Sequence, residues 1–306
     1  MKKHYFNQTF LPCVLLSALA GVFTGVLIFI FKFLSKLIIG LSSDIYTVVR
    51  AEPRYFLLLL GGGAIVGLIS FVVVNYVPNC RGGGIPTAVA ILRGHIPFEW
   101  MTTLVGMFAS SIITFGMGVP LGNEGPSVQM GCAVGRGTVN TLGKKNRAWD
   151  KYVMTGGAAG GFAAATASPL SGILFAFEEV HKRISPIIFM SVSSAVITSY
   201  GTMRVLSGLF KTDFYLFDFT FNTVMPMKYI LTALLSGIVA GAFAILFAKV
   251  YRMTDKLING VLADSPAEAK IILIFVTVAC FGFISSDFTG SGHDLICEIM
   301  YGRAPA

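Results

Sequence analysis

One carboxylate stands in an unusual place in this sequence. Glu124 lies in the segment GNEGP, residues 122–126, and is the only acidic residue between Glu99 and Asp150. An ionised side chain at membrane depth is costly, so such a residue is by default a candidate functional site. The flanking glycines leave backbone N–H groups uncovered, and Pro126 is placed to begin a helix at its first position. Because a helix N-terminus is partly positive, the segment predicts an anion site with a carboxylate beside it.

Two other segments share this arrangement of small residues, a proline and an apolar helix. Three glycines precede the proline in 82–86, and the apolar piece 85–92 would be only about 12 Å long as a helix. A helix that short cannot cross a membrane, so we expect it to be buried in protein or to line a cavity. A third break, at 168–169, precedes a helix that ends in Glu178 and Glu179. Three such breaks predict a cavity built from helix ends.

The composition places these breaks in a membrane. The chain has 306 residues, of which 55% are hydrophobic and 12% charged, and its mean hydropathy is +0.76. A soluble domain carries roughly 25% charged residues. Several apolar runs approach or exceed the length of about 20 residues that a helix needs to cross a hydrocarbon core. The clearest are 10–41, 56–77, 98–121, 152–177, 187–210, 227–250 and 271–285. We predict an all-α, polytopic, integral membrane protein.

The charge and the cysteines exclude two other classes of protein. The formal net charge is +8, but the basic residues are scattered among loops and form no stripe with interleaved aromatic residues. We therefore expect contact with lipid headgroups and no nucleic acid. The five cysteines are widely separated and lack the spacing of a metal or redox site. We expect no cofactor and no metal.

The chain also contains an internal repeat. The segment AGVFTGVLIFIF at 20–31 resembles SGIVAGAFAILF at 236–247, and RGGGIPTAVAIL at 81–92 resembles TGSGHDLICEIM at 289–300. The two offsets, 216 and 208 residues, nearly agree. This pattern is typical of transporters that consist of two homologous halves, with discontinuous helices at a shared site.

The repeat predicts the domain organisation. We expect a single transmembrane domain over 1–306, with a first repeat at about 10–210 and the start of a truncated second repeat at about 225–306. A fragment that does not transport by itself is one alternative that this organisation leaves open.

Four phrases carry a family resemblance. GGGIP (82–86), GNEGP (122–126), TGGAAGGFAAATASPLSGILFAFEEV (155–180) and GSG (290–292) resemble, in this order, the CLC family of chloride channels and chloride/proton exchangers. The resemblance implies an inverted-repeat fold with broken half-helices that meet at a buried anion site. It also implies a homodimer in a membrane, with chloride or other halides and protons as the transported partners, and no enzyme activity. We expect the membrane to be that of a prokaryotic cell.

The resemblance assigns roles to individual residues. The anion-binding candidates are Gly82, Gly83, Gly84, Ile85, Pro86, Gly122, Asn123, Glu124, Gly125 and Pro126. Glu124 matches the gating glutamate of the family: ionised, it can occupy an anion position, and protonated, it can swing away. Glu179 matches the inner proton-transfer glutamate of the exchangers, and Glu178 stands beside it. The pair also fits two ordinary acids at a membrane face near a basic loop.

Two departures from the family pattern leave the anion open. Gly83 stands where the family usually has a serine whose hydroxyl contacts the anion, and Asn123 replaces an arginine. A fluoride-exporting branch also departs from serine at this position but tends to lack the inner glutamate. We therefore expect chloride/proton exchange, with a passive chloride channel or a fluoride exporter as alternatives. An intramembrane hydrolase that uses Glu124 with Ser127 is a further alternative, without Ser–His or metal-ligand spacing to support it.

Overall fold

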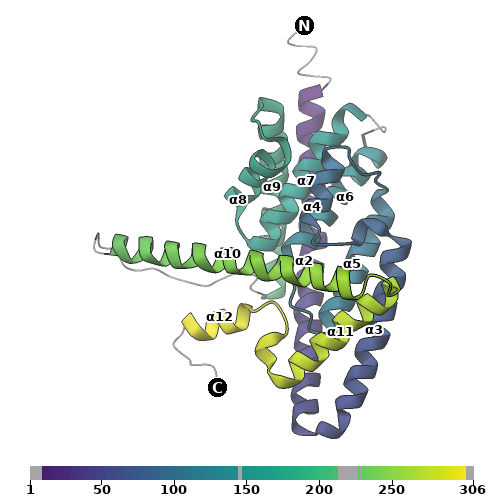
Figure 1. Ribbon diagram of the computed structural model, residues 1–306. Coiled ribbons are helices and arrows are strands. Elements are labelled where there is room, and N and C mark those ends of the chain that lie inside the picture. The colour runs from purple at the N-terminus through teal and green to yellow at the C-terminus, as the bar shows by residue number, and fades with distance from the viewer. Residues whose placement is uncertain (1–8, 144–146, 213–226, 228, 301–306) are drawn as a thin grey trace.

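The computed structural model describes residues 9–143, 147–212, 227 and 229–300, and this part of the chain is helical without a strand. Its helices are α2 (Leu11–Ala51), α3 (Phe56–Tyr76), α4 (Ile85–Leu92), α5 (Trp100–Gly116), α6 (Glu124–Thr141), α7 (Arg147–Thr166), α8 (Pro169–Phe175), α9 (Pro186–Phe210), α10 (Tyr229–Val261), α11 (Ala267–Ile284) and α12 (His293–Met300) (Figure 1). Within the described residues, 5 helical segments are long and apolar enough to cross a membrane. The prediction of an all-α, polytopic protein is confirmed.

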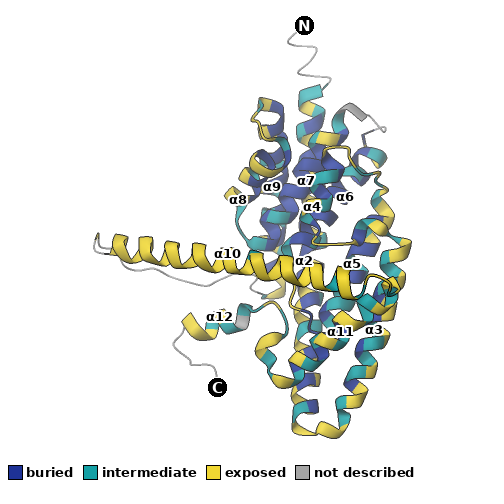
Figure 2. Ribbon diagram, in the orientation of Figure 1, coloured by how far each residue is buried: buried dark blue, intermediate teal, exposed yellow. Residues whose placement is uncertain are grey.

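The core lies where α2, α6, α7 and α9 pack together (Figure 2). The glycine-rich α7 is in the middle of this bundle and presents two faces of small residues. Gly157 and Gly161 lie against the backbone of α6, whereas Gly156 and Gly160 lie against α9. A Cβ on any of these glycines would press on atoms of the neighbouring helix. The three helices therefore approach each other closely because α7 lacks side chains at the contacts.

A second small-residue contact lies near the start of the chain. Gly21 and Gly25 of α2 lie directly against the α9 backbone. The Thr198 hydroxyl of α9 donates to the carbonyl of Ala18 at 2.8 Å, which joins the same two helices by a hydrogen bond. A polar contact of this kind is favourable between helices in lipid, where water is absent as an alternative partner.

Helix α2 is longer than the apolar run 10–41 suggested. It has 41 residues and extends to Ala51, a length of about 62 Å. The polar residues Ser42, Ser43 and Asp44 end the apolar run, but the helix continues because its last turns are packed. Tyr46 is buried there and its hydroxyl donates to the carbonyl of Met117 at 2.9 Å.

The apolar run 152–177 is interrupted, as the Ser-Pro break indicated. Helix α7 ends at Thr166, Ala167 has a φ of 54°, and α8 begins at Pro169. After α8 the chain makes a π-helical turn, Ala176–His181, that contains both candidate acids. Such π turns are rare and are often found at functional sites.

The internal repeat has a structural counterpart. Helix α3, the turn η3 (Pro78–Cys80) and α4 are followed in the same order by α11, the turn η5 (Ser286–Phe288) and α12 at an offset of 208 residues. Gly82 and Gly84 have φ angles of 86° and 79°, and Gly290 and Gly292 have 75° and 72°. Glycine takes such positive angles without strain. Two copies of the same turn therefore introduce the two short helices.

The second copy of the α2 motif lies in α10, which is exposed along its length (Figure 2). From this order of elements we propose the division stated above: one transmembrane domain, with a first repeat at about 10–210 and a second that begins at about 225.

The packing of α6 on α7 is open to a test. We expect Gly131→Ala to destabilise the protein by about 1–3 kcal/mol, because the added methyl would press on the carbonyl group of Gly157. The apparent melting temperature of the purified protein in detergent measures this change. Gly201→Ala on α9 is the matched control, since nothing lies within 4 Å of the added methyl. Equal melting temperatures for the two variants would contradict the packing argument.

Candidate anion-binding site

Two helix N-termini meet at the centre of the candidate site. Gly84 is the N-cap of α4 and lies against the backbone of Gly125, the second residue of α6. A Cβ on Gly84 would press on the Gly125 carbonyl, and a Cβ on Gly125 would press on the Gly83 carbonyl. Glycine at both positions is therefore required for the contact. The result is two partly positive helix ends that converge on one place.

Helix α6 begins two residues earlier than we predicted. Asn123 is its N-cap, since the Asn123 carbonyl accepts the backbone N–H of Ser127 at 3.1 Å, and Glu124 is its first residue. Pro126 is therefore the third residue and not the first. A proline is tolerated there because N–H groups in the first turn have no intrahelical partner. The correction places the backbone N–H of Glu124 itself at the helix end.

The Glu124 carboxylate folds back toward the preceding loop. Its Oε2 lies where a side chain on Gly122 would be, so Gly122 is what leaves room for it. Glu124, Gly122, Gly125 and Pro126 all line one cavity of about 670 Å³. The side chain is half-buried, between the protein and this cavity. The carboxylate therefore lies between the helix end and open space.

The same cavity is bordered by the other glycine-rich segment. Gly82, Gly83 and Ile85 line it, and a side chain on Gly83 would meet nothing within 4 Å. Pro86 lies on the exposed side of α4, within its first turn. The structure thus brings seven of the ten predicted anion-site residues to one cavity, whereas Gly84, Pro86 and Asn123 are not among the residues that line it. Gly83 leaves space where a side chain would fit.

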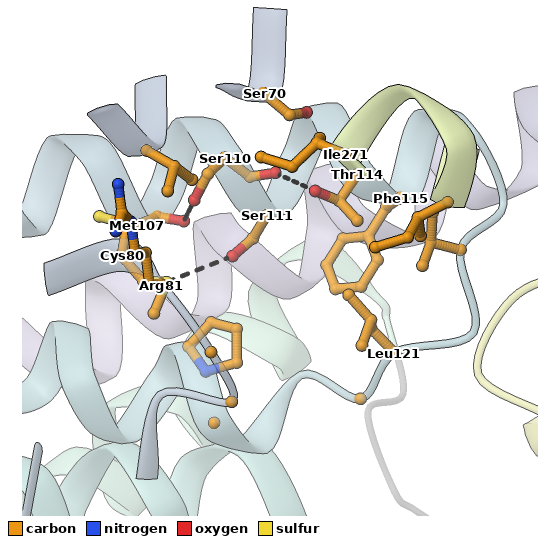
Figure 3. Close-up of a pocket in the computed structure, with 18 of the residues that line it drawn as sticks. Ser70, Cys80, Arg81, Met107, Ser110, Ser111, Thr114, Phe115, Leu121 and Ile271 are labelled. Carbon is orange, nitrogen blue, oxygen red and sulfur yellow. Dashed lines mark hydrogen bonds between the residues drawn. The ribbon is translucent and has the colours of Figure 1, made fainter. Parts of the chain in front are cut away.

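A row of hydroxyl groups on α5 was not among our predicted site residues. Ser110, Ser111 and Thr114 line the cavity together with Ser70 of α3 and with Arg81 (Figure 3). The Thr114 hydroxyl donates to the Ser110 carbonyl at 2.6 Å, and the Ser110 hydroxyl to the Met107 carbonyl at 3.3 Å. The spacing of the three hydroxyl residues on one face of α5 is visible in the sequence and could have indicated them. They were missed because they lie within the apolar run 98–121.

Lys32 is a second residue that the sequence analysis missed. It lies in the middle of α2 and is only 9% exposed. Its ammonium group donates to the carbonyl of Ala165, in the last turn of α7, at 2.8 Å. A lysine inside the apolar run 10–41 was the available indication, because a charge at membrane depth is costly.

The candidate acids Glu178 and Glu179 lie at the other end of α4. Both side chains are exposed on the π turn. Arg93, the residue after α4, donates to the backbone carbonyl of Glu179 at 2.6 Å. Helix α4 has 8 residues, so a length of about 12 Å separates this contact from the end that meets Glu124. The structure does not bring the three acids together but places them at opposite ends of one short helix.

His181 ends the π turn and is outside the apolar spans. Its Nε2 is 3.1 Å from the Thr155 hydroxyl, which itself donates to the Lys151 carbonyl at 2.7 Å. The histidine is therefore the donor in this pair. Burial first, and then the charges of Lys151 and Arg183, lower the pKa of His181 to about 4. The ring is neutral near pH 7, so it does not neutralise the neighbouring acids as a cation.

The arrangement gives no support to hydrolase chemistry at Ser127. The Ser127 hydroxyl donates to the Asn123 carbonyl at 2.7 Å, and the side chain is fully buried within α6. A nucleophile must reach its substrate, and this hydroxyl is held on its own helix.

The comparisons with known proteins agree with this geometry. A family model described as voltage gated chloride channel matches residues 62–306. The H(+)/Cl(-) exchange transporter ClcA of Vibrio cholerae serotype O1 is 28% identical over 327 aligned positions, which cover 90% of this chain and 69% of that protein.

Two solved structures share the fold. One is a slow cyanobacterial Cl−/H+ antiporter, with a TM-score of 0.81 at 20% identity over 96% of this chain and 68% of that chain. The other is a CLC-type fluoride/proton antiporter, with a TM-score of 0.76 at 18% identity over 96% and 71%. The inverted-repeat fold with broken half-helices is thus confirmed. Because the family model also matches well over half of the sequence, the chain belongs to the voltage gated chloride channel family, the CLC family that its motifs resemble.

Proposed function

We propose that this protein moves chloride across a membrane in exchange for protons, with Glu124 as the gate. The observation that carries the proposal is the contact of two helix N-termini beside a carboxylate that faces a cavity. Membership of the voltage gated chloride channel family supports the anion, and the likeness to a named H(+)/Cl(-) exchange transporter supports the exchange. The protein is an integral membrane protein with several spans, and we propose a prokaryotic cell membrane as its location.

Helix ends suit the transport of an anion better than a full charge in direct contact would. An unpaired ion in a low-dielectric interior costs tens of kcal/mol by a Born estimate. The half-charges at the ends of α4 and α6 offset part of this cost, and backbone N–H groups replace the water of hydration. A site that binds too tightly would not release its ion, so partial charges favour turnover. We assign this role to 82–86 and 122–126.

The gate follows from the position of the Glu124 side chain. An ionised carboxylate is itself an anion and competes for the place at the helix end. Once protonated it has no charge to hold it there, and the space over Gly122 and the cavity allows it to move away. Proton uptake and anion entry are thereby coupled at a single residue.

Replacing the carboxylate tests both the function and the gate. Vesicles that contain the wild-type protein should release chloride and move protons in the opposite direction, as followed by a chloride electrode and a pH electrode. Glu124→Gln should keep chloride release and lose proton movement by at least tenfold, because the amide has the shape of the protonated acid but cannot take up and release a proton.

Protein-free vesicles are the control, and a fluoride electrode addresses the alternative substrate. Chloride release by the wild type no faster than the leak would reject the proposed function. Fluoride release much faster than chloride release would favour the second candidate function, a fluoride/proton antiporter. The empty space at Gly83 and the similarity to a solved CLC-type fluoride/proton antiporter support this alternative.

A proton needs a second acid on its way across the membrane, and we propose Glu179 for this step. The π turn exposes its carboxylate, and Arg93 fixes its backbone at the far end of α4. His181 on the same turn is neutral near pH 7, because burial and the charges of Lys151 and Arg183 lower its pKa to about 4. Glu178 beside it is the other candidate.

The two neighbouring acids provide their own control. We expect Glu179→Gln to lower proton flux at least tenfold while chloride flux continues, and Glu178→Gln to leave both fluxes within about twofold of wild type. Both fluxes are recorded in the same vesicles. Equal loss of chloride and proton flux in Glu179→Gln would remove the residue from the proton pathway and assign it to structure.

We further propose that the protein is a homodimer in contact with membrane lipids. Helices α8 and α9 carry exposed large apolar side chains, namely Leu170, Leu174, Phe189, Met190, Ile197, Val205, Leu209 and Phe210. A second copy would bury part of this surface, and lipid would cover the rest. Light scattering of the purified protein, corrected for detergent, should give twice the chain mass of 32.8 kDa. A particle of one chain mass would reject the dimer.

A further inference from the structure

Lys32 is the feature of this chain that the proposed gate leaves unexplained. It lies near the middle of α2, beside Phe31, which is fully buried, and its own side chain is only 9% exposed. Side chains of this kind are almost never buried without a partner, because desolvation of an ammonium group is costly. A lysine that stays at membrane depth therefore has a local negative environment and a reason to be there.

The first part of that environment is the end of α7. The Lys32 ammonium donates to the Ala165 carbonyl at 2.8 Å, one residue before the helix ends at Thr166. The last carbonyls of a helix are partly negative and favour a cation. This contact fixes the position of the charge. The two residues are 133 positions apart in the chain.

The second part is the start of α6. Helix α2 packs against both α6 and α7. Gly157 of α7 lies against Gly131 of α6, and Gly161 lies against Ser127, so the end of α7 that holds Lys32 is level with the start of α6, where Glu124 lies. The sequence of α5, which also packs against α2, contains no charged residue. Other charged residues on the packed elements are Arg136 of α6, Arg147, Asp150 and Lys151 of α7, Arg204 of α9, Arg54 of the turn η2 (Pro53–Tyr55), Glu268 and Lys270 of α11, and Asp287 of η5. Glu124 is the acid at the start of α6, level with the end of α7 that holds Lys32.

We propose that Lys32 is a fixed positive charge that couples proton uptake by Glu124 to anion entry. The inference rests on the proposed function and adds a positioning residue to it. With Glu124 ionised, the lysine and the glutamate together are neutral. Proton uptake by Glu124 leaves the Lys32 charge unbalanced, in addition to the Arg81 guanidinium at the cavity wall, and this fixed positive charge attracts an anion into the site. The converse holds as well: an anion in the site favours proton uptake, since coupling between two ligands is reciprocal.

Removing the charge tests this role. Lys32→Gln can still donate to the Ala165 carbonyl but is neutral. A nearby cation favours the ionised form of a carboxylate, so without this charge the midpoint of the pH profile of chloride flux should move upward by about one pH unit. Chloride affinity near the pH of maximal flux, measured by titration calorimetry on the purified protein, should fall about tenfold.

Two variants separate charge from structure. Lys32→Arg keeps the charge and should retain a midpoint close to that of the wild type. Lys36→Gln, one turn further along the same helix, removes an exposed lysine and should change neither quantity. If Lys32→Gln does not yield a monodisperse protein, the comparison of Lys32→Arg with the wild type decides: a midpoint shift of about one unit with the charge retained would overturn the inference.

The outcomes distinguish this inference from the function beneath it. Wild-type flux and chloride binding, with a midpoint unchanged in Lys32→Gln, would overturn the role of Lys32 and leave the transport function in place. A wild-type protein that neither binds nor moves chloride would overturn both. A raised midpoint and weakened binding in Lys32→Gln, with normal values in Lys36→Gln, would support the fixed-charge role.

Discussion

The structure depends on one contact, the approach of the α4 and α6 backbones at Gly84 and Gly125. Each glycine occupies a place where a Cβ would press on a carbonyl of the other segment. Because the contact is made by main chain alone, both helix ends reach the same point, and their partial charges act together. A side chain at either position would separate the helix ends and divide the site. The rest of the core holds these two segments, which are distant in sequence, in contact.

The glycine-rich helix α7 performs that task. It lies between α6 and α9 and brings both within backbone distance, so α6 is held along its length by a rigid neighbour. At its end it breaks into α8 and the π turn, which carries Glu179, and Arg93 ties that turn to the far end of α4. The helices α4 and α7 thus position both candidate regions: the anion site lies at the start of α4, and Glu179 lies near its end.

Charge is used sparingly at membrane depth. The site combines half-charges from helix ends with three charged side chains: the Glu124 carboxylate, the Arg81 guanidinium at the cavity wall, and the Lys32 ammonium, which the end of α7 holds in place. Opposite charges in one region limit the desolvation cost of each group. The arrangement also means that a single proton changes the net charge of the region, and a change of this kind is what a coupled transporter requires.

Local pattern determined much of this protein. The half-helix at Ile85–Leu92 and the break at Ser168–Pro169 were predictable because short apolar length, glycine and proline act on their own neighbourhood. The repeat of positive-φ glycines before α12 was equally local. Only the tertiary structure decided the contact of Gly84 with Gly125, the continuation of α2 through the buried Tyr46, and the pairing of Lys32 with Ala165. Those contacts join residues far apart in the chain. Which residues meet depends on how the helices pack against one another, and the spacing of residues along one helix does not determine it.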